Sequence, residues 1–193
     1  MKIGVLASQG AFAEHITILK QLGVEAVPVR LPEDLKNIDG LIIPGGESTT
    51  ITKLMLAYKL SDEIRNLAKK GTPIWGTCAG MVLLANEIVD GKKVEPLGIM
   101  NIRVKRNAFG RQRESFETEI AIPVLGKKAF PGVFIRAPLI EQVKSGEILA
   151  RLNDDGTIVA AREGNLLASA FHPELTDDPR FHQYFLDIVG GLN

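Results

Sequence analysis

Cys78 is the residue of this sequence best suited to chemistry. It is the only cysteine, and it stands between two glycines in the segment GTCAG, residues 76–80. A short apolar run precedes the segment and a helical pattern follows it, which is the context of a nucleophile elbow. Flanking glycines allow the sharp turn, and a helix N-terminus favours the thiolate form of a thiol. The alternative is a buried cysteine that only packs.

His172 and Glu174, two positions apart, could activate such a thiol. They lie in the segment FHPE, residues 171–174, after an apolar run, and in extended chain residues i and i+2 share a face. A thiol nucleophile needs a base within hydrogen-bond reach, and the base needs an acceptor that fixes its tautomer. His172 is therefore a candidate base and Glu174 its orienting carboxylate. The alternative is a surface histidine beside a carboxylate, without a catalytic role.

The loop PGGEST, residues 44–49, is a candidate oxyanion hole. Glycines let backbone N–H groups approach a ligand closely, and Ser48 or Thr49 could cap the next helix. Acyl transfer needs donors aimed at the tetrahedral oxyanion, and the N–H groups of Gly46 and Ala79 are a candidate pair. The alternative is an ordinary strand-to-helix turn. The loop matches neither phosphate-binding glycine pattern, so nucleotide binding is the weaker hypothesis.

These three segments follow buried strands in the expected fold. Apolar runs predict strands at residues 2–7, 24–30, 40–43 and 72–76, alternating with helical patterns at 11–23, 48–71 and 81–89. Buried strands that alternate with helices predict a parallel, doubly wound sheet. Ligands bind such sheets beyond the carboxyl ends of the strands, where the candidate residues fall.

The second half of the chain has a different pattern. From about Leu97 strand-like segments follow one another without helices between them, at 97–106, 115–124, 132–138, 147–152, 157–163 and 165–173. Residues 177–192 predict a closing helix. The expected fold class is therefore α/β, a three-layer, mostly parallel doubly wound sheet with appended antiparallel strands. Residues 1–193 fall inside the size range of a single domain.

The composition excludes several classes of function. The 23 basic residues balance 23 acidic ones, and no polybasic run occurs, which argues against nucleic acid or anionic membranes as partners. One cysteine cannot form an internal disulfide, and with three histidines a zinc site is not expected. The first residues show no signal-peptide pattern, and no apolar run approaches about 18 residues. A cytoplasmic protein is expected.

The motifs PGGEST, GTCAGM and FHPEL together resemble the class I, or triad, glutamine amidotransferases, which carry cysteine, histidine and glutamate in this chain order. The segments GVLASQGAFAEH and RNAFGRQRESFE are similar to those of glutaminase subunits of pyridoxal 5'-phosphate synthase, so the resemblance spans essentially the whole chain. It implies a flavodoxin-like sheet and hydrolysis of L-glutamine to L-glutamate and ammonia through a glutamyl thioester. No metal or organic cofactor is implied.

The resemblance also implies a role for each residue. Cys78 would attack the glutamine carboxamide, His172 would transfer protons, and Glu174 would orient His172. Gly46 and Ala79 would bind the oxyanion. The residues expected to hold the amino-acid end of glutamine are Gly45, Gly46, Glu47, Arg106, Ile135 and Arg136. Arginine and glutamate are suited to the carboxylate and the ammonium of a free amino acid.

A partner is implied as well, the synthase subunit, which receives ammonia through a protected route and makes the vitamin B6 cofactor. Docking would activate the glutaminase by rearranging a peptide of the Gly45–Gly46 loop, with contacts near Gln9, Gly10, Glu14 and His15. For His15, as for His182, the plain alternative is a histidine on an amphipathic helix.

Other functions stay open at this point. A glutaminase serving histidine or purine biosynthesis would share the triad but differ in residues 9–15 and 106–117. A cysteine peptidase or chaperone-like protein on a similar sheet is an alternative of another class. A third is a catalytically inactive binding module that keeps only the fold.

Overall fold

The computed structural model describes residues 1–89, 94–106, 108, 115–152 and 156–192. Its strands are β1 (Lys2–Leu6), β2 (Glu25–Val29), β3 (Gly40–Ile43), β4 (Ile74–Thr77), β5 (Ala85–Val89), β6 (Met100–Lys105), β7 (Ser115–Ile120), β8 (Phe130–Ile135), β9 (Leu139–Val143), β10 (Glu147–Arg151), β11 (Ile158–Glu163) and β12 (Leu166–Ser169). Its α-helices are α1 (Phe12–Gln21), α2 (Ser48–Ala57), α3 (Leu60–Lys69), α4 (Ala79–Leu84) and α5 (Arg180–Val189). Short 3-10 turns are η1 (Pro32–Leu35), η3 (Pro123–Leu125) and η4 (Pro173–Leu175).

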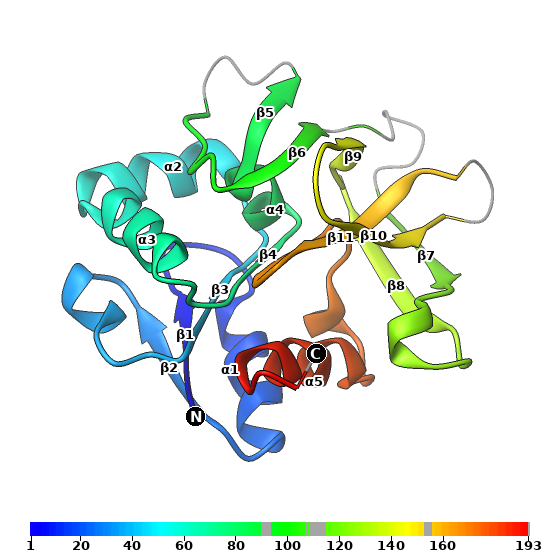
Figure 1. The fold of residues 1–193 in the computed structure, drawn as a ribbon, viewed down its shortest axis with the longest axis horizontal. Coiled ribbons are helices and arrows are strands. Elements are labelled where there is room, and N and C mark those ends of the chain that lie inside the picture. Colours follow the sequence, from blue (N-terminus) through cyan, green and yellow to red (C-terminus); the bar gives the residue numbers. More distant parts are fainter. Residues whose placement is uncertain (90–93, 107, 109–114, 153–155, 193) are drawn as a thin grey trace.

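The strands form one large mixed sheet and a small hairpin (Figure 1). The large sheet has the order β2-β1-β3-β4-β12-β11-β9-β6-β5, with β10 paired to β11, and β7 pairs with β8. From β2 to β12 all neighbours are parallel. The pairs β12–β11, β11–β9 and β9–β6 are antiparallel. The predicted parallel sheet with appended antiparallel strands is confirmed, except that β12, expected among the appended antiparallel strands, extends the parallel sheet beside β4.

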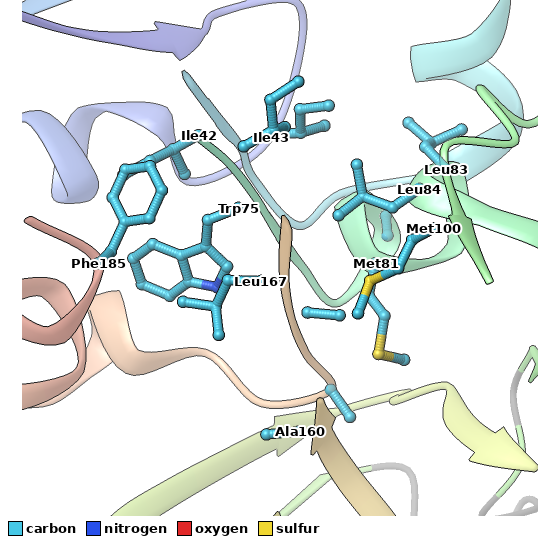
Figure 2. Packing of buried hydrophobic residues seen from close by; sticks show 14 of the residues in the cluster. Ile42, Ile43, Trp75, Met81, Leu83, Leu84, Met100, Ala160, Leu167 and Phe185 are labelled. Atoms are coloured by element: carbon cyan, nitrogen blue, oxygen red, sulfur yellow. The ribbon is translucent and has the colours of Figure 1, made fainter. Parts of the chain in front are cut away.

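Helices cover both faces of the parallel strands, because the strands are apolar on both sides. Trp75 of β4 contacts Phe185 of α5 on one face. On the other face, a Cβ atom at Gly76 would meet the backbone of Gly80 in α4 at 2.5 Å. Figure 2 shows this division, with Trp75 beside Phe185 and the side chains of α4 across the sheet. The three layers are therefore α1 and α5, the sheet, and α2 to α4 (Figure 1).

The predicted helix at residues 81–89 is wrong in its second half. The chain is helical only to Leu84 and then forms β5, which pairs with β6. The N–H groups of Leu97 and Ile99 donate to the carbonyls of Leu83 and Leu84 at 2.7 and 3.0 Å. Those carbonyls are then engaged by a distant segment, so the helix ends.

Two smaller differences concern local breaks. The predicted helix at residues 48–71 is two helices, because Lys59 adopts a left-handed conformation with φ 56° between α2 and α3. Strand β9 was not predicted, since its polar residues give no clear apolar alternation and pairing with β6 supplies its stability. The closing helix α5 is confirmed.

Candidate active site

Cys78 occupies a sharp turn between β4 and α4. Its backbone angles are φ 50° and ψ −106°, a conformation that side chains other than glycine adopt rarely and that concentrates at functional sites. Its N–H donates to the carbonyl of Ser169 at 2.8 Å. The residue is 6% exposed, and Sγ lies 4.0 Å from the carbonyl oxygen of Ile135. The predicted strand-to-helix turn is present.

The glycines on either side of Cys78 permit close packing of the turn. A Cβ atom at Gly80 would collide with the carbonyl oxygen of Ile43 in β3, and one at Gly76 would press on the first turn of α4. Any larger residue would push α4 away from the sheet. The GTCAG pattern therefore follows from the tight approach of this helix to two strands.

His172 and Glu174 form a buried pair at the end of β12. The His172 Nδ1 atom lies 2.7 Å from Glu174 Oε1, and the residues are 7% and 5% exposed. The backbone N–H of His172 donates to the carbonyl of Val133 at 2.8 Å, which fixes the segment against β8. Residues 173–175 form a 3-10 turn rather than the expected extended chain. The turn nevertheless brings imidazole and carboxylate together.

Three separate loops converge at Cys78. A Cβ atom placed on Gly45 would lie 3.2 Å from Cys78 Cβ and 3.2 Å from His172 Nδ1, so the glycine loop, the thiol and the imidazole meet at one point. Burial by itself would lower the pKa of His172, but its hydrogen bonds with Cys78 and with Glu174 raise the pKa from 6.5 to about 10. An imidazolium is therefore favoured next to the sulfur.

The glycine loop is held by Glu47 rather than by Ser48 or Thr49. Glu47 is the N-cap of α2, and its carboxylate accepts from the N–H groups of Thr49 and Thr50 at 3.1 and 2.7 Å, as well as from both hydroxyls. The hydrogen bond from the Thr49 hydroxyl is the main cause that lowers the pKa of Glu47 to about 2. The predicted capping residue was wrong, and the carboxylate is ionised.

The residues predicted to hold the amino-acid end of glutamine gather around this loop. Arg106 Nη2 lies 3.8 Å from Glu47 Oε1. Ile135 is next to the sulfur through its carbonyl, and Arg136 follows it with an exposed side chain and φ 42°. Most of the segment RNAFGRQRESFE falls outside the described residues. A cation and an anion thus lie side by side at the glycine loop, which suits a zwitterionic substrate.

The residues expected at the partner contact divide into two groups. Gln9, Gly10 and Glu14 are exposed. Gln9 Oε1 accepts from the N–H of Glu47 at 3.0 Å, so this surface is joined directly to the glycine loop. The side chain of His15, in contrast, is 0% exposed. In this structure it faces the interior, and a contact with a partner through its side chain is not supported.

His15 lies behind the candidate site, which the sequence did not indicate. His15 Nδ1 lies 2.9 Å from His182 Nε2 of α5, and His15 Nε2 lies 3.4 Å from Glu174 Oε2. His15 and His182 are 167 positions apart, so no local pattern could pair them. The only signal in the sequence was that each histidine interrupts the apolar face of its helix.

The described residues show neither a metal-binding cluster nor a membrane-spanning helix. Among them, no group of three or more histidine, cysteine, aspartate or glutamate side chains could hold a metal ion. Within the same residues, no helix combines the length and the apolar character needed to cross a membrane.

Known proteins match this chain over nearly its full length. A relative from Dehalococcoides mccartyi (strain ATCC BAA-2100 / JCM 16839 / KCTC 5957 / BAV1), named pyridoxal 5'-phosphate synthase subunit PdxT, is 60% identical over 191 residues, covering 98% of this chain and 97% of the relative. A relative from Herpetosiphon aurantiacus with the same name is 59% identical, and the match covers 97% of this chain and 100% of the relative. A crystal structure described as a glutamine amidotransferase has a TM-score of 0.91 at 50% identity. The match covers 97% of this chain and 98% of the other.

The family assignment follows from these matches and from the site. Residues 5–190 match the SNO glutamine amidotransferase family. That span includes Cys78, His172 and Glu174, which the fold brings to one edge of the sheet. This chain belongs to the SNO glutamine amidotransferase family.

Proposed function

We propose that this chain is the glutaminase subunit of a pyridoxal 5'-phosphate synthase. It hydrolyses L-glutamine to L-glutamate and ammonia in the cytoplasm and delivers the ammonia to a synthase subunit. The names of relatives at 60% and 59% identity support the pathway. The observation that carries the chemistry is the meeting of thiol, imidazole and glycine loop, with the imidazole fixed by a carboxylate 2.7 Å away.

The reaction proceeds in two halves. The Cys78 thiolate attacks the carboxamide carbon, and the oxyanion is stabilised by the N–H groups of Gly46 and Ala79. The His172 imidazolium gives its proton to the departing nitrogen, which leaves as ammonia while the C–N bond breaks and a thioester remains. Neutral His172 then takes a proton from water, the hydroxide attacks the thioester, and glutamate leaves as the thiolate re-forms. Glu174 orients His172 throughout.

Charges near the nucleophile favour a free amino acid over a peptide. Glu47 can pair with the ammonium of glutamine and Arg106 with its carboxylate, and the two side chains are 3.8 Å apart. A peptide bond in the same place carries no charge and could form an ion pair with neither side chain. We assign Gly45, Ile135 and Arg136 to the remaining wall of the substrate site.

The decisive experiment combines the chain with the synthase subunit of pyridoxal 5'-phosphate synthase. Ammonia release from glutamine is expected only when both are present, and cofactor synthesis should depend on glutamine. With Cys78→Ala, glutamine should no longer support synthesis but ammonium chloride should, because the partner remains intact. Activation by a histidine-pathway or purine-pathway synthase instead, or glutamine-dependent synthesis by Cys78→Ala, would overturn the proposal.

A further inference from the structure

Glu174 faces a different imidazole with each carboxylate oxygen. Oε1 lies 2.7 Å from His172 Nδ1, whereas Oε2 lies 3.4 Å from Nε2 of His15. The side chains of His15 and Glu174 are both 0% exposed. Behind them, His182 Nε2 lies 2.9 Å from His15 Nδ1. A line of three imidazoles and one carboxylate therefore runs from the thiol to α5, although only His172 touches the reacting sulfur.

The protons on this line have one consistent arrangement. Among the described residues, the buried polar atoms without a hydrogen-bond partner include His15 Nε2, Glu174 Oε2 and His182 Nδ1, and the first two face each other at 3.4 Å. An ionised carboxylate only accepts, so the hydrogen of neutral His15 belongs on Nε2, facing Oε2. His15 Nδ1 is then a bare acceptor, and His182 donates to it from Nε2. The unpartnered atom that remains, His182 Nδ1, is a bare nitrogen.

Both histidines of the pair are neutral. Burial is the main cause that lowers the pKa of His15, followed by the charges of His182 and His172. Burial likewise lowers the pKa of His182 to about 3. Two neutral rings can form one directed chain of hydrogen bonds, whereas two imidazolium ions 2.9 Å apart would repel each other.

The pair is fixed in place by Trp75. The indole ring makes edge contacts with His15 and with His182, at centroid distances of 5.5 and 5.0 Å. Its Nε1 donates to the Ser169 hydroxyl at 3.1 Å, which anchors the ring to β12. β12 also leads into His172. Strands β4 and β12 therefore position both imidazoles that face Glu174, His15 through Trp75 and His172 through the chain itself.

We propose that His15 is a positioning residue of the triad. Its Nε2–H donates to Glu174 Oε2 and holds the carboxylate plane, so that Oε1 stays on His172, and His182 fixes the tautomer of His15. A carboxylate held at one oxygen can rotate about its last bond, and one held at both cannot. The role in catalysis rests on the proposed function, whereas the role in fixing the His172–Glu174 pair does not.

The test compares two amides at position 15. In His15→Gln the amide nitrogen can occupy the place of Nε2 and still donate to Glu174. In His15→Asn the shorter amide reaches only the place of Nδ1, so His182 keeps a partner and Glu174 Oε2 loses its donor. Leu19→Ala is the matched control, because Leu19 is a buried residue of the same helix that packs in the apolar core.

The first readout is alkylation of Cys78 by iodoacetamide between pH 5 and pH 9. The thiolate is the reactive form, and a loosened Glu174 supports the imidazolium less well. At the acid end, His15→Asn should react about tenfold more slowly, the lower end of the loss seen when a group that orients a metal-bound histidine is removed. His15→Gln should react like the wild type. Leu19→Ala should lower the melting temperature and leave the pH profile unchanged.

The second readout is ammonia release with the synthase subunit present. For His15→Asn, kcat should fall by about tenfold at nearly unchanged KM, and His15→Gln should restore it. The proposal would be overturned if His15→Asn kept the alkylation pH profile and the kcat of the wild type. It would also be overturned if His15→Asn and His15→Gln lost activity equally. If His15→Asn does not fold, His15→Met, which fills the site without a donor, takes its place. Because alkylation needs neither glutamine nor partner, a wild type that releases no ammonia would count against the proposed function alone.

Discussion

The backbone N–H of Cys78 donates a hydrogen bond to the carbonyl oxygen of Ser169, at a distance of 2.8 Å. Ser169 is the last residue of β12, and Cys78 follows Thr77, the last residue of the neighbouring parallel strand β4, which stands opposite Ser169. His172 follows Ser169 by three positions, so the register of this strand pair sets how far the imidazole is from the sulfur. If β12 slipped by one residue along β4, the imidazole and the sulfur would move apart. The side chains of β12 would also turn to the other face of the sheet.

Cys78→Gly is expected to be more stable than Cys78→Ala. At φ 50° and ψ −106° a Cβ atom is strained, and glycine removes that strain, a difference of about 1–3 kcal/mol. Both variants lose the thiol, so the comparison isolates the backbone. Urea unfolding followed by circular dichroism measures it. Equal stability of the two variants would mean that the turn is not strained.

Glu174→Gln is expected to reduce ammonia release by about 100-fold to 10,000-fold, because an amide cannot support the His172 imidazolium. Glu174→Gln should also change how the free energy of unfolding depends on pH above pH 6.5. The pKa of His172 is raised from 6.5 to about 10, so its stabilising contribution is complete below pH 6.5 and is lost as the pH rises through about 10. The free energy of unfolding, measured at pH 6.5 and at pH 9.5, should fall less in Glu174→Gln than in the wild type. An identical fall in both would contradict the assignment.

The buried histidine pair is expected to destabilise the protein in acid. The pKa of His182 is lowered from 6.5 to about 3, so the unfolded chain binds a proton in this range that the folded protein excludes. Stability should therefore decline as the pH falls below 6.5, by up to about 1.4 kcal/mol per pH unit for each such group. His182→Gln removes one group and should make the decline shallower between pH 6.5 and pH 5. A decline of unchanged steepness, by chemical denaturation, would show that His182 is not kept neutral.

Gly80→Ala is expected to destabilise the fold by about 1–3 kcal/mol or more, because the new methyl group would overlap the Ile43 carbonyl. Alkylation of Cys78 should change as well, since α4 must move. Gly190→Ala is the control: a Cβ atom there would meet its nearest neighbour, the Leu186 carbonyl, at an ordinary 3.5 Å. Comparable melting temperatures for the two alanine variants would contradict the close packing described for the turn.

The sequence predicted the parts of the fold that depend on local pattern. Continuous apolar runs at β1, β3 and β4 gave the parallel sheet, and the glycines around Cys78 gave the strand-to-helix turn. The triad could be predicted because the ends of parallel strands meet at one edge. The resemblance to triad amidotransferases then joined the three motifs, which no spacing along the chain could do.

What the sequence did not predict depends on distant partners. α4 ends at Leu84 because Leu97 and Ile99 engage its last carbonyls, and nothing in residues 81–89 encodes that competition. Glu47 rather than Ser48 caps α2, which is decided by the path of the loop. His15 was expected at the surface, whereas α5 folds back and buries it against His182. Such outcomes are set by tertiary packing rather than by helical periodicity.

The position of Trp75 makes its intrinsic fluorescence sensitive to the buried histidine pair. It is the chain's single tryptophan, and its indole lies against both His15 and His182. An imidazolium ion beside an indole quenches its fluorescence, whereas a neutral imidazole does so far less. Emission from Trp75 therefore reports the charge of the two histidines behind Glu174, without a label and without substrate.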